Sequence, residues 1–238
     1  MRALRLVTWN VLHRIHGDKW SGHIVGRFPD ERVRTERVAA RVAAWLGEGD
    51  GAVVCLQEVS GDLLEALRAL KGTVFSHRYP RVPSTLKFWK RPLADTSEHL
   101  VTLVAGAGRV LHATTFANDK GKGLLSVGLD GGVTLVNTHV SFGRDGVPQL
   151  QQVSALLRAP AVLAGDLNAG RDVIAAALAP GVALSQVGSP TCLGSGRHDH
   201  GKAIDHVAVA GGELGAVEVL EAEGLSDHHP VRAELRFG

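Results

Sequence analysis

The chain has 238 residues, a formal net charge of +2 and a hydrophobic content of 45%. This length can bury a sizeable core, and a mean hydropathy of +0.06 excludes a disordered chain. No apolar run approaches the roughly 18 residues of a membrane span, and the two cysteines, Cys55 and Cys192, are too few for a disulfide framework. We expect a cytoplasmic protein without a signal peptide.

Short apolar and β-branched runs, typical of strands, recur along the chain and are separated by helical patterns. We expect strands at 3–9, 52–57, 100–105, 109–116, 123–129, 132–138, 161–165, 203–210, 216–221 and 230–237. We expect helices at about 30–47, 60–70, 147–158 and 170–178. In the first helix Val38, Val42 and Trp45 fall on one face, and Asp30 suits the N-cap.

Many strands and few helices, mixed along the chain, favour an α/β (α+β) fold in which two packed sheets are flanked by helices. No linker, low-complexity tract or internal repeat divides the chain, so we expect a single domain over 1–238. The longest expected loop is 76–99. Loops of that length in compact domains are usually functional or mobile.

Six polar clusters end or directly follow apolar runs. They are Thr8-Trp9-Asn10, Gln57-Glu58, Asn137-Thr138-His139, Gly165-Asp166-Leu167-Asn168, Ile204-Asp205-His206 and Ser226-Asp227-His228. A sheet core places such residues at its edge, where loops gather and water reaches the protein. One such cluster would mean little, but six that carry Asn, Asp, Glu and His predict one shared site.

The residue types in these clusters indicate metal-assisted phosphate chemistry. Asn10, Glu58 and Asp227 offer the hard oxygen ligands that Mg²⁺ or Mn²⁺ prefers, without a thiolate. Asp166 suits the orientation or deprotonation of a water molecule, and Asn168 suits contact with that aspartate or with a phosphate oxygen. In-line attack of water on a phosphate ester needs this combination of a cation and a water-positioning acid.

Two histidines complete the predicted catalytic set. Asp205 can pair with His228, because a carboxylate fixes the ring tautomer and favours the imidazolium ion. His139 is a second proton donor or a stabiliser of the charge that develops on phosphorus. We expect His206 and His229 to be structural neighbours of this set. His198-Asp199-His200 has no suitably spaced cysteine partner, and we expect a solvated or phosphate-facing loop there.

From Thr8-Trp9-Asn10 to Ser226-Asp227-His228 the chain resembles the endonuclease/exonuclease/phosphatase superfamily, the DNase I-like metal-dependent phosphoesterases. The resemblance implies a four-layer sandwich. It implies that Asn10 and Glu58 hold the metal with Asp227 nearby, that Asp166 orients water and that Asn168 contacts phosphate. It also implies that Asp205 pairs with His228, the catalytic histidine.

Basic and aromatic residues interleave in the segment 76–99, a mixture suited to phosphates and stacked bases. The candidate substrate-binding residues there are Arg78, Arg81, Lys87, Trp89, Lys90 and Arg91. A surface loop without such a role is the alternative. His13, Arg14, His16 and Lys19 either line the site entrance or belong to ordinary surface. Arg34, Arg37 and Arg41 form a stripe that acidic residues interrupt, so we expect a solvated helix face.

The sequence therefore predicts a monomeric Mg²⁺- or Mn²⁺-dependent phosphoesterase that acts on nucleic acid or a nucleotide-like ester. Two alternatives stay open. One is a phosphomonoesterase or phosphodiesterase for a small-molecule or lipid phosphate. The other is a binding module on a scaffold that has lost catalysis, which the intact clusters argue against because buried, mutually repelling carboxylates have no use in a retired site.

Overall fold

The computed structural model describes residues 2–84, 92–193 and 201–238, which form two six-stranded sheets. The first sheet has the order β11 (Glu213–Val219), β12 (Val231–Phe237), β1 (Arg2–Asn10), β2 (Ala52–Ser60), β4 (Glu98–Val104), β3 (Thr73–Arg78). The second has the order β5 (Gly108–Phe116), β6 (Asp119–Leu129), β7 (Thr134–His139), β8 (Ala161–Asp166), β10 (Asp205–Ala210), β9 (Ala183–Leu184). A 3₁₀ turn, Gly143–Asp145, follows β7.

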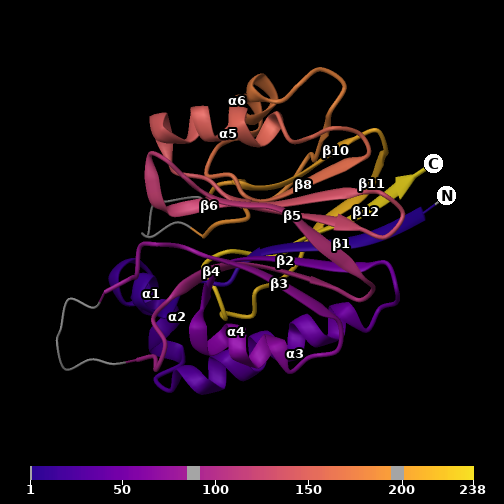
Figure 1. The fold of residues 1–238 in the computed structure, drawn as a ribbon. Helices are drawn as coiled ribbons and strands as arrows, with labels where there is room; N and C mark the ends of the chain where they lie inside the picture. Colours follow the sequence, from indigo (N-terminus) through magenta and orange to yellow (C-terminus); the bar gives the residue numbers. More distant parts are fainter. Residues whose placement is uncertain (1, 85–91, 194–200) are drawn as a thin grey trace.

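Helices cover the outer face of each sheet (Figure 1). The first sheet carries α1 (Arg14–Trp20), α2 (Gly22–Arg27), α3 (Glu31–Leu46) and α4 (Gly61–Arg68), and the second carries α5 (Gly146–Ser154) and α6 (Arg171–Ala177). This arrangement confirms the expected sandwich. Among the residues that the structure describes, no helix has both the length and the apolar character needed to span a membrane.

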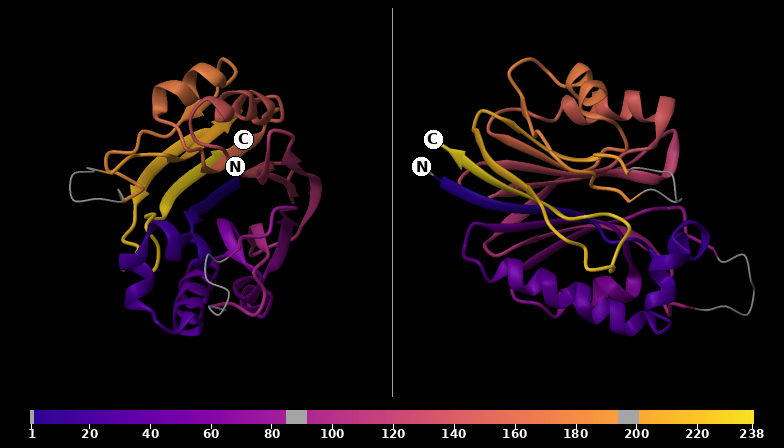
Figure 2. Two further views of the ribbon diagram at one scale, coloured as in Figure 1. Left: turned by 90° about the vertical axis from the view of Figure 1, so that its left-hand side faces the viewer. Right: turned by 180° about the vertical axis from the view of Figure 1, so that it is seen from behind.

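The main core lies between the sheets, where inward side chains of both meet. Leu6 and Val53 of the first sheet and Leu135 and Val162 of the second are all buried in it. A second core lies under α3, whose Val38, Val42 and Trp45 pack on the first sheet. The two termini lie side by side at one end of the sandwich, and α1 and α2 lie at the other (Figures 1 and 2).

The expected loop 76–99 is shorter than predicted, because residues 73–78 form the edge strand β3 and residues 98–99 begin β4. Tyr79, the first residue after β3, is 1% exposed and packs in the main core, so its ring is not available to a ligand. The mixed polarity of β3 explains the error, since an edge strand that is only half-buried shows no apolar run. The helices α1 and α2 and the two-residue strand β9 were also not predicted, because short elements carry little periodicity.

The parallel strands β7 and β8 approach closely at Gly165. Its φ of +153° strains any residue with a side chain, and a Cβ added there would lie 2.0 Å from the Thr138 carbonyl oxygen. Gly165 pairs with Thr138 on one side and with His206 on the other. Glycine is therefore required one residue before Asp166.

We expect Gly165→Ala to destabilise the protein by about 3 kcal/mol or more, since the clash is with backbone in a packed core. Gly170→Ala is the matched control, because a Cβ there meets no atom within 4 Å. Urea unfolding of both variants checks the prediction. Equal stability of the two would contradict it.

Candidate active site

The six polar clusters meet at one end of the sandwich because of the strand directions. The strands β1 and β2 run parallel and both end there, and so do β7 and β8. Their antiparallel neighbours β12, β4, β6 and β10 begin at the same end. The site is therefore assembled from the ends of four strands and the beginnings of four others.

Asn10 joins the two sheets at this end. Its Nδ2 donates to Glu58 Oε1 at 3.1 Å and to Asp166 Oδ2 at 3.0 Å. Its Oδ1 accepts from the Leu12 backbone N–H at 3.0 Å. Since Glu58 lies in β2 of the first sheet and Asp166 ends β8 of the second, one buried amide holds two carboxylates of different sheets together.

Glu58 lies where the pairing of β2 with β4 is irregular, and its φ of 57° is unusual for a residue with a side chain. The His13 backbone N–H donates to Glu58 Oε2 at 3.1 Å. Burial would raise the pKa of Glu58, but the charges of His16, His139 and Lys122 outweigh it and hold that pKa well below its usual range. Glu58 is therefore a carboxylate at neutral pH.

Asp166 is buried behind Glu58. Its Oδ1 accepts from the Asn168 backbone N–H at 3.0 Å, and its Oδ2 lies 3.2 Å from His139 Nε2. Burial alone would raise the pKa of Asp166, but the neighbouring His139 and His228 hold it well below its usual range. The ammonium group of Lys122 in turn lies against the His139 ring.

His228 and Asp205 form a buried pair. His228 Nδ1 lies 2.9 Å from Asp205 Oδ2, which also accepts from the Thr191 hydroxyl at 2.6 Å. Burial would lower the pKa of His228, but Asp205 and Asp166 raise it well above its usual value. His228 Nε2 faces Asp166 Oδ2 at 3.9 Å. The imidazolium form of His228 therefore stands between two carboxylates.

Asp227, next in the chain, faces another direction. Its Oδ2 accepts from the hydroxyl of Ser21, which follows α1. The loop that carries Asp227 is fixed by Ser226, whose hydroxyl donates to the Asn10 carbonyl at 2.7 Å, and by the Trp9 indole, which donates to the His228 carbonyl at 2.9 Å. Asp227 and His228 are thus held in different surroundings although they are adjacent.

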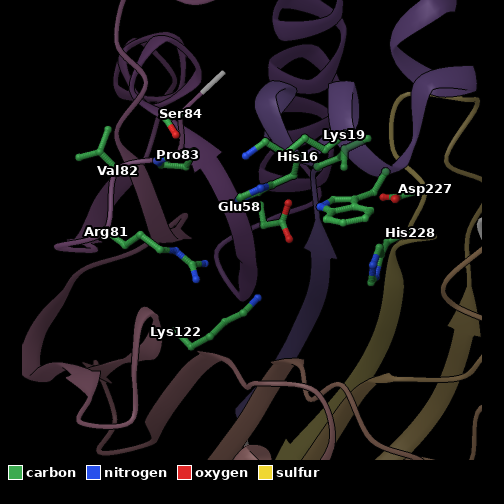
Figure 3. A pocket seen from close by; sticks show the side chains of 12 residues that line it. His16, Lys19, Glu58, Arg81, Val82, Pro83, Ser84, Lys122, Asp227 and His228 are labelled. Carbon is green, nitrogen blue, oxygen red and sulfur yellow. The ribbon is translucent and has the colours of Figure 1, made fainter. Parts of the chain in front are cut away.

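A pocket of about 520 Å³ opens beside these groups (Figure 3). Glu58, Asp227 and His228 line it together with the basic residues His16, Lys19, Arg81 and Lys122. In Figure 3 Asp227 and His228 lie on one side, Arg81 and Lys122 on the other, and Glu58 lies between. The pocket therefore offers carboxylates for a cation and several positive groups for an anion.

The donor set fits a hard divalent cation. Glu58 and Asp227 present carboxylate oxygens to one pocket, and its described lining includes no cysteine. The Asn10 oxygen now faces Leu12, so coordination by Asn10 requires its carboxamide to turn over. Ligand atoms of Asp166, Asp205 and His228 also lie within 4.8 Å of one another. We interpret that group as a hydrogen-bonded chain, because His228 Nδ1 already meets Asp205.

The remaining candidate site residues do not all lie at this pocket. The Asn168 side chain donates to the Val140 carbonyl at 2.9 Å and so lies beside Asp166. Arg81 lines the pocket, but Arg78 lies on a different pocket with Arg68 and His99. Arg78 is therefore not brought to the candidate site. The other candidates of this segment lie outside the described residues: Lys87, Trp89, Lys90 and Arg91.

His206 and His229 do turn away from the pocket, as expected. His206 Nε2 meets the Ala203 carbonyl, and His229 Nδ1 meets the Leu220 carbonyl. Of the residues near the entrance, His16 and Lys19 line the pocket, whereas His13 and Arg14 are buried. The triplet 198–200 lies outside the described residues.

Two charged residues of this site were not singled out in the sequence. Lys122 lies near the beginning of β6, and Glu98 begins β4 and is fully buried, with His16 Nε2 at 2.9 Å from its Oε2. Both precede an apolar run instead of following one. A charged residue one or two positions before a predicted strand is the signal that would have found them.

Arg34 is buried, which corrects the expectation of a fully solvated stripe on α3. Its guanidinium donates to the carbonyls of Val11, Leu12 and Leu225 at 2.6 to 2.8 Å and is paired with Glu31. These carbonyls belong to the segment after Asn10 and to the segment before Asp227. Arg34 therefore ties together the two loops that carry candidate metal ligands.

We expect Arg34→Met to lower the free energy of unfolding by about 3 kcal/mol, because it leaves three carbonyls without their donor. Arg34→Lys should not restore it, since one ammonium lacks the planar fork. The control is Arg32→Met, whose side chain is 87% exposed. Urea denaturation measures all three, and an Arg34→Met protein as stable as the control would contradict the role.

The two thiols lie in different surroundings. Cys55 is fully buried, and burial raises its pKa to about 12. Cys192 is partly exposed and pairs with His228 through an isolated β-bridge. Cys192 is thus the thiol within reach of a reagent near the candidate site.

We expect a thiol reagent at pH 8 to modify one cysteine of the native protein and two after unfolding, because thiolate is the reactive form and Cys55 supplies none. The Cys192→Ser variant should show no reaction until it unfolds. Counting released chromophore measures both. A native protein that reacts twice would contradict the burial of Cys55.

Comparison with known proteins shows the family of the chain. The model of the Endonuclease/Exonuclease/phosphatase family matches residues 7–228. The chain belongs to this family, whose members are divalent-metal-dependent, hydrolytic phosphoesterases. Membership supports an enzyme of that class. No curated protein matches the chain.

Solved structures share the fold. An endonuclease/exonuclease/phosphatase from Beutenbergia cavernae is 24% identical with a TM-score of 0.67, over 100% of this chain and 72% of that one. D. rerio TDP2, complexed with a single-strand DNA product, is 16% identical with a TM-score of 0.68, over 99% and 100%. A family member from Bacteroides vulgatus is 17% identical with a TM-score of 0.66, over 100% of both chains. At these identities the likeness establishes the fold.

Proposed function

We propose that this protein is a Mg²⁺- or Mn²⁺-dependent phosphodiesterase that acts on nucleic acid or a nucleotide-like substrate. One observation carries the proposal: two carboxylates, Glu58 and Asp227, share a pocket with His228 and with several cationic side chains. A cation held by the carboxylates and an anionic ester held by the cations would meet there.

Glu58 and Asp227 would hold the metal, with Asn10 as a further oxygen ligand. When bound, such an ion neutralises charge on the phosphate and favours attack at phosphorus. The protein prepares Glu58 for this role by keeping it ionised and fixing its position through Asn10 and the His13 backbone N–H. Lys122 and Arg81 across the pocket favour an anionic ligand.

Asp166 is the candidate for orienting the attacking water. It is kept as a carboxylate by His139 and His228, and two donors fix it, Asn10 Nδ2 and the Asn168 N–H. An ionised acceptor in a fixed position aligns a water without reorganisation during the reaction. Asn168, held beside it, would contact a phosphate oxygen.

His228 and His139 would supply donors for the oxygens of phosphorus. Asp205 keeps the His228 ring charged and oriented, so that its Nε2 can hold or pass on a proton at the pocket. His139 lies between Asp166 and Lys122, so an imidazole and an ammonium group would face the expected position of the phosphate. This arrangement suits the charge that develops on the oxygens.

Removal of the metal or of either acid–base group should abolish hydrolysis. We expect EDTA to stop cleavage, and Mg²⁺ or Mn²⁺ to restore it. Asp166→Ala and His228→Ala should each lose at least about 100-fold in kcat while the far-ultraviolet circular dichroism stays that of the native fold. Either variant with full activity would show that the role assignment is wrong.

A substrate panel separates the proposal from its alternatives. It should contain single- and double-stranded DNA, RNA, dinucleotides, a lipid phosphodiester and phosphomonoesters, each with Mg²⁺ and Mn²⁺. The proposal expects the highest kcat/KM on a nucleic acid or dinucleotide. Preference for a monoester or lipid would favour the small-molecule alternative, and metal binding without turnover on any substrate would favour the binding module.

A further inference from the structure

Large apolar side chains stand exposed at the active-site pocket and in the segments next to it. Nine such side chains are exposed among the described residues, and Trp20, Val82, Phe142 and Leu193 are four of them. Trp20 and Val82 line the pocket. The Leu193 backbone N–H donates to the Asp227 carbonyl at 2.7 Å, and Phe142 is three residues beyond His139.

The two aromatic residues are the most exposed of the four. Trp20 is 73% exposed and Phe142 is 70% exposed. Burial of a side chain of this size is a large favourable contribution, so leaving both in water is a cost that a partner can relieve. Both aromatic side chains are thus available for contact with a ligand.

These residues come from the two halves of the sandwich. Trp20 ends α1, which covers the first sheet, whereas Phe142 follows β7 of the second sheet. The ring of Phe142 lies under the Lys202 ammonium at 5.6 Å, and the backbone of Lys202 bonds to Cys192, which is bridged to His228. Phe142 is therefore connected through Lys202 and Cys192 to the segment that carries His228, and Trp20 lines the pocket together with His16 and His228.

Cations accompany both aromatics. Lys19 precedes Trp20 in the pocket lining, and Lys202 lies over Phe142. A membrane surface or a protein partner would bury a continuous apolar patch. Here each exposed ring instead has an ammonium group beside it, so no such patch is formed by the two rings. Interleaved cations and flat aromatic faces suit a strand that alternates phosphates with bases.

From this arrangement we propose that Trp20 and Phe142 are stacking platforms for unpaired bases of a strand whose scissile phosphate lies in the pocket. The substrate class is then a single-stranded or locally unpaired nucleic acid. This inference rests on the proposed phosphodiesterase function and specifies its substrate. In a duplex the base faces are occupied by neighbouring bases, so such platforms would find no ring to stack on.

The test compares two oligonucleotides of equal length and charge. One is a single strand with bases, and the other has abasic units in place of every nucleoside. Binding is measured by fluorescence anisotropy in EDTA, so that no hydrolysis is needed. We expect the wild-type protein to bind the base-bearing strand ~5- to 100-fold more tightly than the abasic strand, as one or two stacked bases would give.

Variants then locate the preference. Trp20→Ala and Phe142→Ala should each weaken binding of the base-bearing strand by about fivefold or more and leave binding of the abasic strand unchanged. Trp20→Phe should keep most of the affinity, since a flat ring remains. Val173→Ala, an exposed apolar residue on α6, is the control and should bind both strands as the wild type does.

Two results would overturn the inference. Equal losses on both strands would mean that the rings act through the fold and not through bases. Unchanged oligonucleotide binding, with loss of binding to anionic phospholipid vesicles, would mean that the rings meet a membrane.

The outcome is separable from that of the proposed function. A protein with the predicted base preference in EDTA and no hydrolysis of any diester would support the platforms and contradict the phosphodiesterase. Hydrolysis without any base preference would contradict the platforms and leave the phosphodiesterase in place.

Discussion

Negative charge gathered at one end of the sandwich is the constraint on which the rest of the structure depends. Glu58, Asp166 and Asp205 lie close together with little or no access to water, and a buried charge is stable only when donors and opposite charges surround it. Each carboxylate has such partners. Asn10 serves the first two across the sheets, and His228 and Thr191 serve Asp205.

The direction of the strands determines which residues of this site can be predicted from the sequence. Asn10, Glu58, His139 and Asp166 end apolar runs, and the strands that carry them run in parallel pairs, so their convergence was predictable. Glu98 and Lys122 lie at or near the beginnings of antiparallel strands. They were not predicted, because only polar residues at the C-terminal ends of apolar runs were considered as site residues.

The fold, like the site, was predictable only where the sequence shows a clear apolar pattern. Every strand with an apolar run was expected, and the four helices with a clear apolar face were expected. The half-buried edge strand β3 and the short helices α1 and α2 were not expected. Tertiary contacts, and not a local apolar pattern, determine the structure of these segments. Arg34 is the clearest case, since nothing in its helical position signals that three carbonyls from two distant loops converge on it.

The family relationship concerns the fold, whereas the rim of the pocket concerns the choice of substrate. The family shares a fold at low identity, as the comparison with TDP2 and the bacterial proteins indicates. The rim of the pocket carries Trp20 and Arg81, with Phe142 exposed outside the lining, and we propose that a substrate makes its first contacts there. We expect substrate choice to depend on the residues of the rim and the reaction to depend on the buried carboxylates and histidines.

We propose above all that the metal binds between Glu58 and Asp227. A crystal structure with Mn²⁺ located by anomalous scattering tests this most directly. We expect an anomalous peak bound by Glu58 and Asp227. A peak held instead by Asp166, Asp205 and His228 would contradict it.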